Sequence, residues 1–142
     1  MPTTLAADCE PDEFSEQPRL YCFDDSRFLS FWYEAFPTLD EAKDEYQGWL
    51  TYYGIATDTA DCFAVPIPLP CETGYKTGEY DPAGSVAGIV DENNSGWLFF
   101  THEPALVFGK GLVNLNGTQT YADMFGYWVS DASRVVYPPP TP

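Results

Sequence analysis

Basic residues are scarce in this sequence. Six Lys and Arg residues stand against 22 Asp and Glu residues, which gives a formal net charge of −16 at pH 7. A charge of this size repels nucleic-acid phosphates and anionic membrane surfaces over a Debye length of about 8 Å at physiological salt. Direct binding to nucleic acid or to a membrane surface is therefore not expected. The acidity is compatible with a cationic partner or with a saline habitat.

Long hydrophobic runs are also absent. No stretch approaches the roughly 20 apolar residues that a membrane-spanning helix needs. Residues 1–14 contain neither Lys nor Arg and no apolar segment, so we expect no secretory signal and synthesis in the cytoplasm. With 142 residues, of which 44% are hydrophobic, the chain is long enough for one core. We predict an extended N-terminal arm over 1–20, one globular β-rich domain over 21–137 and a Pro-rich tail over 138–142.

The four cysteines include no C-x-x-C pair, and the chain has a single histidine. Structural zinc sites usually combine closely spaced ligand pairs, so a zinc site is not expected. Short loops separate Cys9 from Cys22 and Cys62 from Cys71, which makes these two local disulfides geometrically easy. Four cysteines allow three connectivities, however, and four buried free thiols are an equal alternative.

One amphipathic helix is predicted over residues 38–53. Thr38 and Glu41 have the spacing of a capping box at a helix start, and Gly54 supplies a stop. Between them, apolar residues recur every three or four positions, as on the buried side of a helix. They are Leu39, Ala42, Tyr46, Trp49, Leu50 and Tyr53.

From residue 55 onward the sequence is typical of strands and turns. Short apolar or alternating runs predict strands at 85–90, 97–102, 105–108, 112–115, 118–124 and 127–129. Asn116 and Gly117 predict the type I′ turn of a hairpin. Prolines at 66, 68 and 70 restrict the segment 62–71 to an edge strand or a polyproline loop. For the aromatic segment 28–36, both helix and strand stay open.

These elements together predict a mainly β, α+β fold. We expect a small antiparallel β-sheet domain, sandwich or barrel-like, with the 38–53 helix packed on it.

Residues 91–96, with the sequence Asp-Glu-Asn-Asn-Ser-Gly, follow the pattern of the first half of an EF-hand calcium loop. Asp91, Asn93 and Ser95 fall on the first, third and fifth ligand positions of that pattern. The twelfth position, where a glutamate has to complete the coordination sphere, is His102. With strands predicted on both sides, a hairpin turn explains the segment better. We expect no metal and no cofactor.

A catalytic site is not predicted either. His102 is the only histidine, and the sequence offers neither a nucleophile motif nor a pair of contrasting carboxylates to act with it. The segment Gly109-Lys110-Gly111 lacks the upstream glycine and the following Ser or Thr of a phosphate-binding loop. It is interpreted as a turn between strands.

Aromatic residues are the most informative feature that is present. Ten Tyr, ten Phe and four Trp make up 17% of the chain. Tyr and Trp combine a large apolar body with a polar tip, which favours protein interfaces and also sugar-stacking platforms. Many of these rings must fill the core. The clustered ones are our interface candidates: Phe31, Trp32, Tyr33, Tyr52, Tyr53, Tyr127 and Trp128.

A function that works by adhesion agrees best with these features. We expect a non-enzymatic structural protein of an extracellular particle, where thiols can oxidise, such as a capsid decoration (cement) or tail accessory protein of a tailed-phage virion. Its partners would be neighbouring shell or tail subunits, in a homo-oligomer or a larger assembly. Two alternatives stay open: an acidic inhibitor that mimics nucleic acid, and a carbohydrate-binding module.

Overall fold

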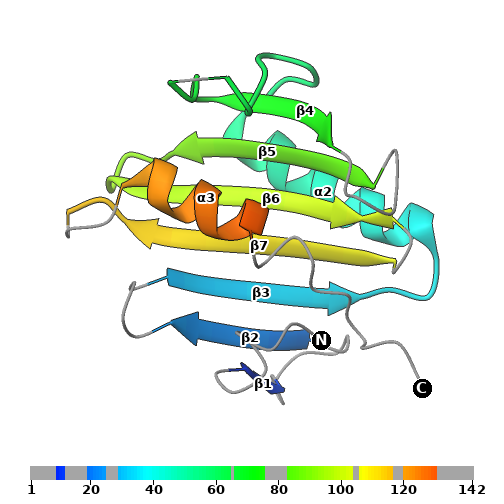
Figure 1. Ribbon diagram of the computed structural model, residues 1–142. Coiled ribbons are helices and arrows are strands. Elements are labelled where there is room, and N and C mark those ends of the chain that lie inside the picture. The colour runs from blue at the N-terminus through cyan, green and yellow to red at the C-terminus, as the bar shows by residue number, and fades with distance from the viewer. Residues whose placement is uncertain are drawn as a thin grey trace.

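The fold is built on one antiparallel sheet of seven strands, in the order β1-β2-β3-β7-β6-β5-β4 (Figure 1). The computed structural model describes residues 9–11, 19–24, 29–64, 66–75, 83–103, 106–116 and 120–130. The strands are β1 (Cys9–Pro11), β2 (Arg19–Asp24), β3 (Leu29–Ala35), β4 (Cys71–Tyr75), β5 (Gly84–Val90), β6 (Ser95–His102) and β7 (Val107–Asn114). The helices are α2 (Leu39–Tyr53) and α3 (Tyr121–Ser130).

The two helices cover opposite faces of the sheet. Figure 1 shows α3 in front of the central strands and α2 behind them. Each face has its own core cluster, one that includes the buried side of α3 and one that includes the buried side of α2. The predicted mainly β, α+β class, with an antiparallel sheet and a packed helix, is confirmed. The layer that covers each face in the described part of the chain is a helix and not a second sheet.

Helix α2 forms where the capping pattern predicts it. The Thr38 hydroxyl accepts a hydrogen bond from the Glu41 N–H at 3.3 Å, and Gly54 ends the helix in the left-handed conformation with φ 71°. Residues Ala42, Tyr46 and Leu50 form its buried stripe.

A buried carboxylate attaches α2 to the neighbouring strand. Glu72 of β4 accepts hydrogen bonds from the Tyr46 hydroxyl at 2.7 Å and from the Asp58 N–H at 2.9 Å. Only 4% of Glu72 is exposed, so these two donors replace the water that its carboxylate loses on folding. The contact helps to fix the position of α2 on the sheet.

Gly109-Lys110-Gly111 is not a turn, because β7 runs through it without a break. The strands predicted at 105–108 and 112–115 are thus parts of one strand. A Cβ atom at Gly109 would lie 2.2 Å from the Phe100 ring, and one at Gly111 would lie 2.6 Å from the Phe31 ring. These glycines leave room for rings that lie over the backbone of β7, which is a packing role and not a turn role.

The strands predicted at 118–124 and 127–129 are wrong, because Tyr121–Ser130 forms helix α3. The Asn116–Gly117 hairpin is wrong with them, since a helix follows β7 where the second strand was expected. Thr120 and Asp123 form a reciprocal cap: the Asp123 N–H donates to the Thr120 hydroxyl at 3.1 Å, and the Thr120 N–H donates to the Asp123 carboxylate at 2.8 Å. The buried residues Tyr121, Met124, Phe125 and Trp128 share one side of the helix.

Two open alternatives are resolved. The aromatic segment 28–36 contains a strand, β3, paired with both β2 and β7. In the proline-containing segment 62–71, the described residues before β4 form a loop, and a Cys62–Cys71 disulfide closes it, which confirms that local pair. Phe63 of this loop packs on Phe125 of α3, with ring centroids 5.3 Å apart.

Part of the predicted N-terminal arm belongs to the sheet. Strand β1 pairs with β2, and Cys9 lies directly opposite Cys22 in the register. Opposite residues in an antiparallel pair are about 4.5–5.5 Å apart at their Cα atoms, a separation that a disulfide can bridge. A Cys9–Cys22 disulfide stays a prediction. The Pro-rich tail over 138–142 lies outside the described residues.

Candidate functional site

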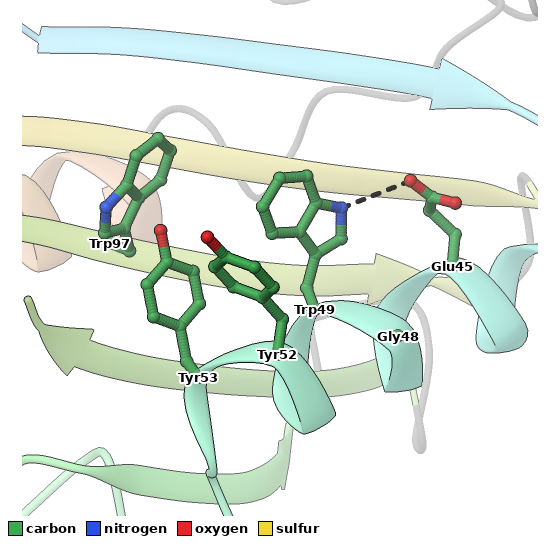
Figure 2. Close-up of a pocket in the computed structure, with 6 residues that line it drawn as sticks. All are labelled: Glu45, Gly48, Trp49, Tyr52, Tyr53 and Trp97. Atoms are coloured by element: carbon green, nitrogen blue, oxygen red, sulfur yellow. Dashed lines mark hydrogen bonds between the residues drawn. The ribbon is translucent and has the colours of Figure 1, made fainter.

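A groove lined mainly by aromatic side chains lies between α2 and β6 (Figure 2). Its volume of about 600 Å³ is in the range of sites for small ligands and short side-chain groups. The lining residues are Glu45, Gly48, Trp49, Tyr52, Tyr53 and Trp97. All of them except Trp97 come from α2.

The helical side of the groove follows from the spacing of the rings along α2. Trp49 and Tyr53 flank the buried stripe of the helix and are half-buried, whereas Tyr52 is 76% exposed. Figure 2 shows all three side chains projecting from one side of α2, with Trp97 extending beside them from β6. Gly48 lies among them and adds no side chain to the groove.

Several of the rings in and below the groove are stacked, whereas the exposed ring of Tyr52 is edge-on to Trp49 and Tyr53, with interplanar angles of 72° and 85°. Trp97 and Phe99, two residues apart on β6, have an interplanar angle of 6° and centroids 6.0 Å apart. Trp49 stacks on Phe99 at 5.5 Å and lies 6.3 Å from Tyr53, with interplanar angles of 18° and 17°. Such offset stacks hold the rings in fixed orientations. The groove is therefore largely preformed on its inner side.

Each tryptophan of the groove donates its indole N–H to a carboxylate. Trp49 Nε1 donates to Glu45 Oε1 at 3.2 Å, and Trp97 Nε1 donates to Asp91 Oδ2 at 3.0 Å. The Ser95 N–H, followed by the Trp97 indole and the Asn93 N–H, lowers the pKa of Asp91 below its usual value. Asp91 is thus ionised at neutral pH. Burial, together with the negative charge of Asp91, raises the pKa of Tyr53.

A lysine beside the groove contacts the faces of two tryptophan rings. Lys110 of β7 has its ammonium 4.4 Å from the centroid of the Trp49 ring and 5.3 Å from that of Trp32. These distances are typical of cation–π contacts. Lys110 is not one of the lining residues, so it occupies the neighbouring gap between the two indoles.

The structure separates the predicted interface residues into two groups. Trp32, Tyr52 and Tyr53 lie on the α2 side of the sheet, half-buried or exposed. Phe31, Tyr33 and Trp128 lie in the core on the α3 side, each at most 1% exposed, and present no surface to a partner in this structure. Alternation along β3 explains why neighbours in sequence point to opposite faces. The side chain of Tyr127 lies outside the described residues.

The calcium candidates form a hairpin turn. Asp91 Oδ1 accepts from the N–H groups of Asn93 and Ser95 at 2.9 and 3.0 Å, and Asn94 has a positive φ of 60°. The Asp91 carboxylate therefore stabilises the β5–β6 turn and holds the Trp97 indole. Within the described ranges, no three His, Cys, Asp or Glu side chains are grouped so that they can hold a metal ion.

His102 is a buried residue at the end of β6. It is 2% exposed, and its Nδ1 lies 3.4 Å from the Tyr75 hydroxyl, which donates to the Thr101 carbonyl at 2.7 Å. Burial lowers the pKa of His102, so the imidazole is neutral at pH 7. The side chain is far too buried to meet a substrate at the surface of this conformation.

Comparisons of the chain with protein-family models, with curated proteins and with solved structures found no match. Among the helices that the structure describes, none combines the length and the apolar character needed to cross a bilayer. The groove has to be interpreted from its own residues.

Sequence reasoning missed several groove residues. The sequence predicts Trp49 on the buried stripe of the helix and Trp97 in a strand, and it marks neither Glu45 nor Gly48 as a site residue. Lys110, which lies beside the groove, is expected in a turn. One local signal was present: Trp49, Tyr52 and Tyr53 are three and four residues apart and therefore share one side of a helix. The proximity of Trp97 to these rings depends on how α2 crosses the sheet, and no local sequence pattern predicts that crossing.

Proposed function

We propose that this protein is a non-enzymatic structural protein that binds neighbouring protein subunits of an extracellular particle, and that the groove between α2 and β6 is the contact site. In its most specific form the particle is a tailed-phage virion, with the chain as a capsid decoration or tail accessory protein. The observation that carries the proposal is the open row of rings over Trp49, Tyr52, Tyr53 and Trp97. Tyr and Trp rings of this kind are enriched among residues that dominate protein interfaces.

A glycine inside α2 supports a role in binding. Gly48 lies in the middle of the helix, where glycine costs about 0.5–1 kcal/mol relative to alanine. A Cβ atom at this position meets nothing within 4 Å among the described residues, so packing against them does not require glycine. The position lines the groove, and a side chain there would occupy the space of a bound partner.

The disulfide supports the extracellular setting. Stable disulfides belong mainly to proteins that function in oxidising environments, virion surfaces included. The Cys62–Cys71 bond closes the loop that packs on α3, so it is part of the folded core and not an exposed redox pair.

Site-specific photocrosslinking tests the proposal. The photoreactive amino acid p-benzoylphenylalanine replaces Tyr52 in the groove, or Phe63, which is 44% exposed and packs on the α3 side. In the cells that naturally produce the chain, we expect it to sediment with particles and position 52 to crosslink to one particle protein. Position 63 should give no such product. A chain that stays in the free fraction, or equal crosslinking from both positions, would contradict the proposal.

A carbohydrate-binding module is the second candidate, because the 76% exposed ring of Tyr52 beside Trp49 is also a suitable surface for stacking a sugar. A glycan array separates the two functions. Binding to a defined oligosaccharide that is lost on Tyr52→Ala would favour the carbohydrate function over the structural one.

A further inference from the structure

The groove carries negative charge and no positive charge among its lining residues. Glu45 lines it, and Asp91 holds the indole of Trp97. Next to Glu45, the solvent side of α2 exposes Asp40, Glu41 and Asp44. Its one lysine, Lys43, forms an ion pair with Glu103 at 3.5 Å. In a chain of net charge −16, the negative electrostatic potential of these acids favours a cationic partner and disfavours an anionic one.

The ring faces add to the attraction for a cation. Aromatic faces carry a negative quadrupole potential, which is strongest for tryptophan. Trp49 and Trp97 both donate their indole N–H to carboxylates, and such donation increases the electron density of the ring. The two indoles of the groove are therefore better cation acceptors than free indoles.

Lys110 provides an internal example of the same chemistry. Its ammonium lies over Trp32 and Trp49 at distances of 5.3 and 4.4 Å from the ring centroids. Lys110 therefore shows that the faces of these indoles contact a cation in the folded protein. The groove presents further rings, from Tyr52, Tyr53 and Trp97, with no basic side chain among its lining residues.

We propose that the groove recognises an arginine side chain of the partner subunit. This inference rests on the function proposed above and specifies the chemistry of the partner. The planar guanidinium stacks on aromatic faces and pairs with carboxylates in two-point geometry, which a compact ammonium cannot do. Its counterparts are the rings of Trp49 and Tyr52 together with the carboxylate of Glu45.

A neutral sugar fits the same groove less well. Both indole N–H groups are already used by carboxylates, so they are not available as donors to sugar hydroxyls. The remaining polar groups of the lining are the Glu45 carboxylate and the hydroxyls of Tyr52 and Tyr53. The negative charge of Glu45 attracts a cationic ligand but gives a neutral sugar no comparable stabilisation.

Two synthetic peptides test the proposal on the full-length protein. One is acetyl-Ser-Gly-Arg-Gly-Ser-amide, and the other replaces arginine with citrulline, which has nearly the same shape without the charge. Binding is followed by the NMR signals of the indole N–H groups. We expect the arginine peptide to shift the signals of Trp49 and Trp97, but not that of the core residue Trp128, and to bind at least fivefold more tightly than the citrulline peptide.

Matched variants identify the source of the selectivity. Glu45→Gln keeps a hydrogen-bond acceptor for Trp49 and removes the charge, and Tyr52→Leu keeps apolar area and removes the ring. Each substitution should weaken the binding of the arginine peptide at least threefold and change the affinity for the citrulline peptide little. Gly126→Gln, on α3, should leave both affinities unchanged. Tyr52 is 76% exposed, so its replacement should not unfold the chain.

Equal affinity for the two peptides, or an arginine affinity that Glu45→Gln leaves unchanged, would overturn the inference. Saturable binding of an oligosaccharide at the same indoles, without arginine binding, would overturn it as well. The outcome is separable from that of the proposed function. Crosslinking from position 52 without arginine selectivity refutes the inference alone, whereas arginine selectivity in a chain that never joins a particle refutes the proposed function alone.

Discussion

Two glycines, Gly109 and Gly48, lie in opposite surroundings. Gly109 in β7 lies under the Phe100 ring, which a Cβ atom would approach to 2.2 Å. Gly48 in α2 has no atom of the described residues within 4 Å of an added Cβ. In the first case the interior of the protein requires glycine. In the second, no described residue requires glycine, which agrees with the proposed contact between the groove and a partner.

Alanine substitutions at these positions should change stability in opposite directions. Gly48→Ala should raise the free energy of unfolding by about 0.5–1 kcal/mol, because it removes backbone entropy from the unfolded chain. Gly109→Ala should lower it by about 1–3 kcal/mol through overpacking against the Phe100 ring. Urea denaturation measures both. A destabilising Gly48→Ala would mean that the position is constrained within the chain and not by a partner.

His102 should make stability depend on pH in a defined window. Burial lowers the pKa of this residue in the folded protein, while the unfolded chain keeps a histidine pKa near 6.5. Below about pH 6.5 the unfolded state therefore takes up a proton first, so the free energy of unfolding falls as the pH falls. One histidine contributes at most about 1.4 kcal/mol per pH unit.

Urea denaturation of the wild type and of His102→Gln at pH 7.5, 6.5 and 5.5 measures this contribution. Since His102 is the only histidine, the difference between the two proteins should change across this range. A difference that is independent of pH would contradict a depressed pKa.

At the scale of elements, the two helices show what a sequence can and cannot predict. Helix α2 was predicted because its cap, its apolar spacing and its final glycine agree. Helix α3 has an equivalent cap at Thr120 and Asp123, but its aromatic residues and Val129 also favour strands, and packing against the sheet decided the outcome. Local signals that agree predict an element, whereas conflicting ones leave the decision to tertiary contacts.

The groove was only partly predictable for the same reason. Tyr52 and Tyr53 were recognised as interface candidates from their clustering in the sequence. Trp97 is more than 40 residues away and meets Trp49 because α2 lies across β6, with the two ring centroids 6.4 Å apart. That juxtaposition depends on the topology of the sheet, which the strand pattern alone did not determine.

The cap of α3 gives a prediction at this scale. Thr120→Ala removes the hydroxyl that accepts from the Asp123 N–H, and should lower the free energy of unfolding by about 1 kcal/mol. Thr38→Ala at the start of α2 is the matched case and should have a similar effect. Thermal or urea denaturation measures both. No change for Thr120→Ala would indicate that packing alone holds the first turn of α3.

The loop closed by the Cys62–Cys71 disulfide gives a second prediction at the scale of elements. The Cys62–Cys71 bond closes a loop with a sequence separation of 9, for which chain entropy predicts a stabilisation of about 2–3 kcal/mol. The double substitution Cys62→Ala and Cys71→Ala should lower the free energy of unfolding by that amount.

Peptide mapping without reduction should recover Cys62 linked to Cys71 and Cys9 linked to Cys22. Any exchanged pair would contradict the register of β1 and β2 as a guide to connectivity.

At the scale of the whole molecule, each face of the sheet has a core cluster, and the groove lies outside the cluster on the α2 face. Gly48 and Tyr52, at the rim of the groove, are exposed and belong to neither cluster. Changes at the rim of the groove should therefore affect binding without unfolding the core. This separation allows the central claim, that the groove is a contact site for a protein partner, to be tested by a variant that is more stable than the wild type.

Gly48→Gln and Gly126→Gln form the matched pair for that test. Both replace an exposed glycine inside a helix, and an added Cβ at either position meets nothing within 4 Å in the described part of the chain. Both should therefore raise the melting temperature by a few degrees. Only the first fills the groove. The decisive measurement is the fraction of each variant that sediments with particles from its native source. Our account predicts at least a tenfold loss for Gly48→Gln and none for Gly126→Gln, and a Gly48→Gln chain that sediments with particles like the wild type would contradict it.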